Sequence, residues 1–150
     1  MAERSDAPTK TAERELVITR LFDARRELVW KAWTDPEHVA RWFGPRGFTT
    51  PRSTITMDVR TGGSFELMMV ADDDGKEYPA GGTFLEVEEP ERLVWRDRDV
   101  DLTVTVTFTD VGGRTEMTCH VVGKTGGAQA YDGWSTMFDK LGELLAPTRR

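Results

Sequence analysis

The fold is decided by residues 28–44, which read LVWKAWTDPEHVARWFG and hold three of the chain's five tryptophans. Leu28, Val29 and Trp33 recur at helical spacing, and Asp23 is placed to cap this first helix. A second helix then starts at residues 34–37, Thr34-Asp35-Pro36-Glu37. The side chain of Thr or Asp can accept hydrogen bonds from the free N–H groups of the first turn, and proline fits there because its missing N–H would have no partner. The segment therefore predicts two short helices, the second ending at Gly44.

Strands are predicted on both sides of these helices. The first covers residues 15–23, where β-branched residues are frequent, and six more cover residues 55–59, 64–71, 82–88, 92–96, 102–109 and 115–122. Threonine alternates with valine and phenylalanine from Thr103 to Thr109, a period of two that gives a strand one polar and one apolar face. A last helix is predicted from Tyr131 to Leu145. This order favours an α+β protein with helices on one face of an antiparallel sheet.

Length and charge restrict the class of protein. A chain of 150 residues suits one domain, which we place at residues 15–147 after a polar, disordered tail at residues 1–14. The net charge of −6 and pI near 5.0 argue against nucleic acid and anionic membranes as partners. With one cysteine, no signal-peptide pattern and no apolar run of about 18 residues, we expect a cytoplasmic protein without membrane insertion.

Five separated stretches resemble one known superfamily. They are FDARRELVWKAWTDPEHVARWFGP, GGSFELMM, GGTFLEVEEPERLVW, VTVTFTD followed by a glycine pair and a threonine, and YDGWSTMFDKLGELL. Together they are similar to the SRPBCC, or START-like, superfamily, and within it to the branch called activator of ninety-kilodalton heat-shock protein ATPase, C-terminal-domain-like. The resemblance covers about residues 15–146 and follows the family's order.

The resemblance implies a helix-grip fold. In that fold a curved antiparallel sheet, here of about six to seven strands, wraps around a long C-terminal helix and leaves an apolar cavity between them. Relatives are similar to lipid-transfer domains, polyketide cyclases, antibiotic self-resistance proteins and co-chaperones, so the fold alone does not identify the activity.

Large apolar residues that face this gap are the candidates for ligand binding. Met68 and Met69 stand on opposite faces of their strand, and we choose Met69 as the inner one. Each candidate has an alternative role as an ordinary core residue. The set is Trp42, Phe43, Phe65, Leu67, Met69, Trp95, Val106, Met117, Trp134 and Phe138.

Catalysis would require a polar group in the cavity, and the candidates are Glu86, Tyr78 and Tyr131. Glu86 shares a strand face with Phe84, so it points inward only if Phe84 does. The opposite face carries Leu85 and Val87, and its apolar character favours that face as the inner one. We therefore expect no catalytic residue and treat these three as the alternative.

Other reactive residues have structural interpretations. His38 is expected to be an exposed capping or ion-paired residue, and His120 to face away from the apolar side chain of Cys119, whose burial would leave it inert. No ligand spacing for zinc or iron occurs, and the DDDG sequence at residues 72–75 is a hairpin turn rather than a calcium loop. Asp97, Asp99 and Asp101 could align three carboxylates, but a solvated hairpin is the preferred interpretation.

The sequence thus predicts a protein that binds a small hydrophobic ligand, lipid-, aromatic- or polyketide-like, without a cofactor or metal. One alternative is a polyketide cyclase or dehydratase, and another is a protein-interaction or co-chaperone module. A homodimer is also expected, because one side of a short helix does not easily bury both Trp30 and Trp33.

Overall fold

The structure of the chain is a computed structural model that describes residues 14–98, 100–123 and 128–146. The predicted tail lies outside these residues, except for Arg14, with which the first strand begins. In the described part of the chain, no helix is both long enough and apolar enough to cross a membrane.

The elements follow the predicted order. Strand β1 (Arg14–Phe22) precedes helices α1 (Arg26–Thr34) and α2 (Pro36–Trp42). Then come β2 (Phe48–Thr49), a short 3-10 helix η2 (Arg52–Thr54), β3 (Thr56–Met57), β4 (Ser64–Ala71), β5 (Glu77–Glu88), β6 (Arg92–Asp97), β7 (Leu102–Val111), β8 (Arg114–Gly123) and the long helix α3 (Ala128–Leu145). The sequence did not predict β2 or η2, and β5 begins five residues before its predicted start.

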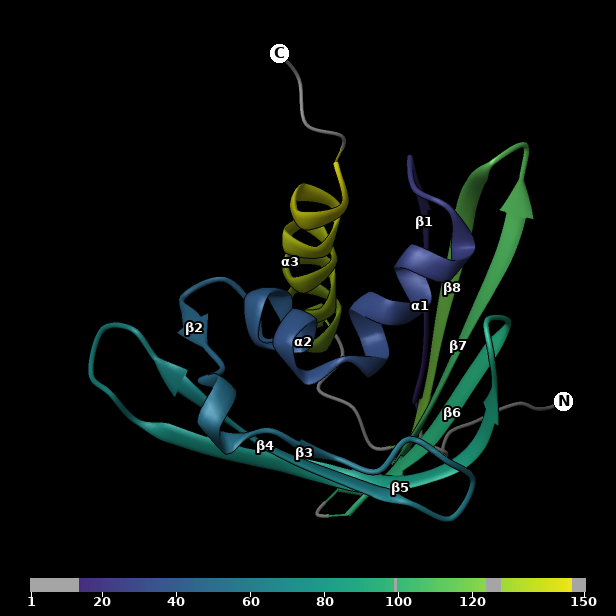
Figure 1. The fold of residues 1–150 in the computed structure, drawn as a ribbon. Helices are drawn as coiled ribbons and strands as arrows, with labels where there is room; N and C mark the ends of the chain where they lie inside the picture. Colours follow the sequence, from purple (N-terminus) through teal and green to yellow (C-terminus); the bar gives the residue numbers. More distant parts are fainter. Residues whose placement is uncertain (1–13, 99, 124–127, 147–150) are drawn as a thin grey trace, which may run out of the picture.

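The strands form one antiparallel sheet with the order β1-β8-β7-β6-β5-β4-β2, and β3 also pairs with β4. The sheet bends strongly, so that β1, β7 and β8 stand nearly upright while β4 and β5 run across the base (Figure 1). Helices α1, α2 and α3 all lie on the concave side of this bend (Figure 1). The α+β helix-grip architecture predicted from the sequence is therefore confirmed.

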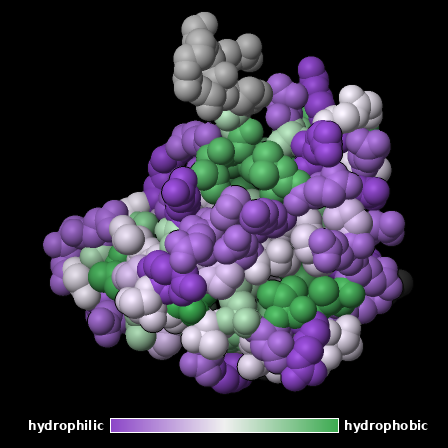
Figure 2. Space-filling model, in the orientation of Figure 1, coloured by the Kyte–Doolittle hydropathy of each residue, from purple (hydrophilic) through white to green (hydrophobic). Residues whose placement is uncertain are grey.

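The surface seen from the same side is mostly hydrophilic, with apolar side chains gathered in separate areas (Figure 2). One such area lies over the C-terminal part of α3 (Figure 2). The principal core is inside the bend, where the helices pack on the apolar face of the sheet.

The junction between α1 and α2 forms as predicted. The Asp35 carboxylate accepts a hydrogen bond of 3.0 Å from the Glu37 amide, and Pro36 occupies the first turn. The prediction that Asp23 caps α1 is wrong. Arg25 is the N-cap residue and has no side-chain cap, while an Asp23 oxygen lies 3.8 Å from Arg114 Nε. Asp23 precedes the cap position by two residues, so it pairs across to the β7–β8 turn instead.

The argument for a homodimer from Trp30 and Trp33 is also wrong, because both side chains are buried within the chain. Trp30 packs edge-on against Phe108 of β7 with ring centroids 5.8 Å apart, and Trp33 packs against Trp42 at 4.8 Å. Helix α1 lies in the concavity of the sheet and meets apolar surface on more than one side. Both rings are covered without a second copy of the chain.

A β-bulge in β5 corrects the predicted inner face of that strand. Phe84 pairs with Trp95, but Glu86 pairs with Val94, so the register shifts between them. Leu85 is the extra residue, and it points outward with 46% of its surface exposed. Because the bulge resets the alternation, Phe84 before it and Val87 after it both face the core. The sequence argument assumed unbroken alternation and chose Leu85 wrongly.

Candidate functional site: a cavity between the sheet and α3

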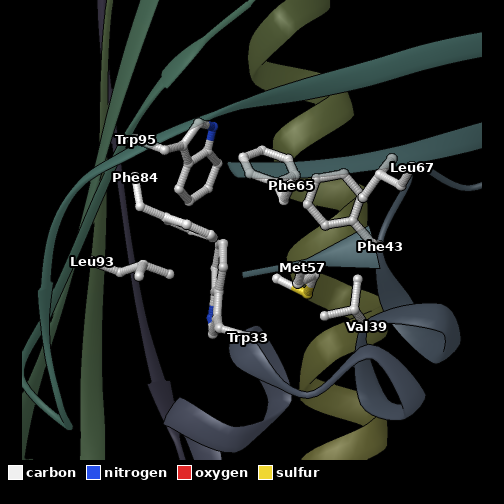
Figure 3. A pocket seen from close by; sticks show the side chains of 9 residues that line it. All are labelled: Trp33, Val39, Phe43, Met57, Phe65, Leu67, Phe84, Leu93 and Trp95. Atoms are coloured by element: carbon white, nitrogen blue, oxygen red, sulfur yellow. The ribbon is translucent and has the colours of Figure 1, made fainter. Parts of the chain in front are cut away.

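Two cavities share a wall beneath the helices. The deeper one has a volume of about 20 Å³ and lies among apolar side chains of α1, α2 and the inner face of the sheet (Figure 3). This volume holds little more than one water molecule. Its lining consists of Trp33, Val39, Phe43, Met57, Phe65, Leu67, Phe84, Leu93 and Trp95. The aromatic rings that Figure 3 shows converging here therefore fill most of the space themselves.

The second cavity is much larger, with a volume of about 260 Å³, and lies between strands β4 to β6 and helix α3. It shares Phe43, Phe65 and Trp95 with the first cavity. The other lining residues are Pro45, Met69, Ala80, Gly81, Asp97, Gly133, Trp134 and Met137. Its wall is thus mainly aromatic and thioether, with one carboxylate. We call it the α3 cavity.

Small residues on facing elements leave this space open. On the inner face of β5, Ala80 pairs with Leu67 and Gly82 pairs with Phe65, so two successive inward positions carry almost no side chain. Across the gap, Gly133 of α3 lines the cavity, and a Cβ added there would meet no heavy atom within 4 Å. Gly82 itself has no room for a side chain, since a Cβ would lie 2.4 Å from the Arg96 carbonyl oxygen.

The carboxylate of Asp97 is placed by strand register. Leu93, Trp95 and Asp97 alternate along β6, and Asp97 pairs with Gly82 of β5. Since Leu93 and Trp95 belong to the core, Asp97 shares their inner face. The sequence considered Asp97 only as one carboxylate of a solvated hairpin. Asp101 does lie on that hairpin, 2.9 Å from Arg96, while Asp99 is outside the described residues.

The segment between α2 and β2 forms another wall of the α3 cavity through Phe43 and Pro45. Helix α3 holds it in place. The Gly44 amide donates to the Met137 sulfur at 3.0 Å, and the Lys140 ammonium donates to the Gly44 carbonyl at 3.0 Å. Burial lowers the pKa of Lys140, and Arg46 lowers it further while Asp72 and Glu143 oppose this. This wall is therefore tied to the same helix that covers the sheet.

The predicted ligand-binding residues divide into two groups. Six of them line the two cavities: Phe43, Phe65, Leu67, Met69, Trp95 and Trp134. The other four, Trp42, Val106, Met117 and Phe138, are fully buried within the core cluster. Residues that the sequence did not select, above all Ala80, Gly133 and Met137, complete the α3 cavity. Ala80 and Gly133 gave no signal in the sequence, because they contribute to the cavity by having little or no side chain.

The three candidates for catalysis lie away from both cavities. Glu86 faces outward after the bulge and accepts a 2.6 Å hydrogen bond from Arg92 Nε. Tyr78 is 41% exposed and packs edge-on against Phe48, and Tyr131 is 44% exposed near the start of α3. None of them is among the residues that line the two cavities.

Cys119 and His120 are placed as predicted, whereas His38 is only partly exposed and Asp35, not His38, caps α2. Cys119 is buried, and burial strongly raises the pKa of its thiol. His120 points to the opposite face and contacts the Glu15 carboxylate. Among the residues described by the structure, no three His, Cys, Asp or Glu side chains are grouped so that they could hold a metal ion.

Comparison with protein families identifies the chain. The model of the family described as Activator of Hsp90 ATPase homolog 1-like protein matches residues 23–146. The chain belongs to this family. The family lies within the SRPBCC superfamily, so the resemblance inferred from the five stretches is confirmed.

Solved structures agree with this assignment. A protein from Chromobacterium violaceum is 27% identical with a TM-score of 0.80, and the match covers 90% of this chain and 99% of that one. An AHSA1-like protein from Aeromonas hydrophila is 28% identical with a TM-score of 0.78, covering 91% and 99%. A protein from Nitrosomonas europaea is 29% identical with a TM-score of 0.76, covering 87% and 93%. The comparison with curated proteins gave no match.

Proposed function

We propose that this member of the Activator of Hsp90 ATPase homolog 1-like family binds a small hydrophobic molecule in the α3 cavity. The observation that carries the proposal is the cavity itself, about 260 Å³ of space between sheet and helix. This space is partly open to solvent, and its wall is mainly apolar. A hydrophobic molecule that enters it moves apolar surface out of water and onto apolar side chains, which is favourable.

The volume limits the size of the ligand. Pockets for drug-sized molecules span roughly 300–1,000 Å³, and the 260 Å³ of this cavity falls just below that range. An engineered apolar cavity of about 150 Å³ in another protein binds benzene. A compound of one or two rings therefore fits the α3 cavity. A long acyl chain or a four-ring polyketide would extend beyond it, so we favour the aromatic class among the predicted ligands.

The positions of the three predicted catalytic candidates favour binding over a cyclase that would use them. Apolar shape and one or two polar groups are sufficient for a binding site. An enzyme of the cyclase type needs an acid or base within hydrogen-bond reach of the substrate. Glu86, Tyr78 and Tyr131 lie outside the cavity and do not meet this requirement in the described conformation.

Gly133 offers a direct test, because it lines the cavity and a Cβ added there meets no heavy atom within 4 Å. We expect Gly133→Leu to place its side chain in the α3 cavity and to weaken binding of indole at least about tenfold, measured by isothermal titration calorimetry. Gly133→Ala is the matched control, since it adds only a methyl group and should keep most of the affinity. Both variants should be more stable than the original chain, because glycine is a poor helix former.

Two results would overturn the proposal. The first is that the original chain binds neither indole nor toluene and that native mass spectrometry of protein from its own host finds no retained compound. The second is that Gly133→Leu, shown to be folded by its thermal transition, binds indole as well as Gly133→Ala does. That result would place the ligand elsewhere.

A further inference from the structure

We propose that the α3 cavity selects a small aromatic amine, whose ring lies among the aromatic side chains and whose protonated amino group binds to Asp97. The proposal rests on the proposed function and specifies its ligand. It starts from one feature: an otherwise apolar wall includes a carboxylate.

The position of Asp97 makes it available to a ligand. Its cross-strand partner is Gly82, which has no side chain to cover the carboxylate. The adjacent backbone of Gly81 and the small side chain of Ala80 complete this part of the wall. A carboxylate has two oxygens and about four lone-pair sites, so Asp97 can accept a hydrogen bond from a ligand in addition to the interaction it has within the protein.

The surrounding side chains favour a positive charge. Four aromatic rings line the cavity, from Phe43, Phe65, Trp95 and Trp134, and the rings of Phe65 and Trp95 meet edge-on at 5.6 Å. The face of an aromatic ring attracts an organic cation within about 6 Å of its centroid. The sulfur atoms of Met69 and Met137 add polarizable surface. The aromatic rings and the Asp97 carboxylate together therefore favour a ligand that has both a positive charge and an apolar group.

Other ligand classes fit this wall less well. A neutral hydrocarbon would lie against the Asp97 carboxylate and offer it no hydrogen bond. An anionic ligand, such as an aromatic acid, would bring two like charges together. An ammonium group adds a strong charge-assisted hydrogen bond to the Asp97 carboxylate. The net charge of −6 also favours a cation over an anion at long range.

Three compounds of nearly equal size separate these classes: 2-phenylethylamine, 2-phenylethanol and propylbenzene. We expect the original chain to bind the amine about tenfold or more tightly than the hydrocarbon, measured by isothermal titration calorimetry at neutral pH. Asp97→Asn should remove that preference and still bind propylbenzene. The control is Asp101→Asn, which changes the same charge on the exposed hairpin beside β6 and should leave the preference unchanged.

Each other outcome overturns the proposal and has its own meaning. If the amine and propylbenzene bind equally, or if Asp97→Asn keeps the preference for the amine, Asp97 is not the anchor, although the cavity still binds hydrophobic molecules. If 2-phenylethanol binds as tightly as the amine and both depend on Asp97, the site recognises a hydrogen-bond donor rather than a cation. If none of the three compounds binds, the proposed function fails as well. Retention of propylbenzene by Asp97→Asn shows that this variant is folded.

Discussion

A single residue, Leu85, decides which side chains of β5 face the helices. As the extra residue of a β-bulge it lets Phe84 and Val87 point the same way, although unbroken alternation would place them on opposite faces. Glu86 is turned outward by the same shift and forms an ion pair with Arg92. The residue that could have served as an acid or base in the cavity is thus removed from it by local backbone geometry.

Cys119 gives a prediction at the same scale. Its thiol is buried and burial raises its pKa, so both access and ionisation oppose reaction. We expect Cys119 in the folded protein to react with iodoacetamide at pH 8 roughly a hundredfold more slowly than in denaturant. Thr109→Cys supplies an exposed thiol on β7 as the control, and it should react rapidly. Equal rates for folded and unfolded Cys119 would contradict the structure.

At the scale of elements, the two short helices are fixed in different ways. Asp35 caps α2 with its side chain, and Pro36 fits the first turn because its missing N–H would have no partner there. Helix α1 begins without a side-chain cap and is stabilised by burial of Val29, Trp30, Ala32 and Trp33. Packing, rather than capping, therefore fixes α1.

This difference predicts unequal effects of two similar substitutions. We expect Asp35→Ala to lower the free energy of unfolding by about 1 kcal/mol, because the α2 amide of Glu37 loses its acceptor. Asp23→Ala should change it by less than about 0.5 kcal/mol, since it removes only an exposed ion pair with Arg114. Urea denaturation of both variants measures the difference. A larger loss for Asp23→Ala would mean that Asp23 stabilises the start of α1 after all.

For the molecule as a whole, one concave space is divided between a solid core and an open cavity. Phe138 of α3 is fully buried and packs against Trp33, Trp42 and Trp134. Towards β4 and β5, the same helix faces Ala80 across the α3 cavity. The end of the concavity filled with large rings provides stability, and the end with small residues provides the proposed site.

Two truncations test this division. Phe138→Ala should lower the free energy of unfolding by about 3–5 kcal/mol, because it opens a new void in packed core. Met69→Ala should cost only about 1 kcal/mol, since this half-buried side chain already borders open space, and it should change indole affinity instead. Chemical denaturation and calorimetry of both variants provide the measurements. Similar stability losses for the two would indicate that no such division exists.

Much of the fold could be read from the sequence because its signals are local. Helical spacing, the Asp35-Pro36 cap and the strict alternation from Thr103 to Thr109 depend on neighbours along the chain, and the structure has these elements where the pattern predicted them. Inward-facing positions on regular strands, such as Met69 on β4, followed from the same periodicity. Four of the ten predicted lining residues, Phe65, Leu67, Met69 and Trp95, reach a cavity for that reason.

The site itself was decided by tertiary structure. The cavity lies where Ala80 and Gly81 on β5 meet Gly133 on α3, a coincidence of small residues from distant parts of the chain. Asp97 enters the cavity wall through its register with Gly82, and the bulge at Leu85 turns Glu86 away. Spacing along one strand does not report which side chains lie opposite one another or where they are missing. The sequence by itself therefore determined the architecture, while packing between distant elements determined the cavity and its charge.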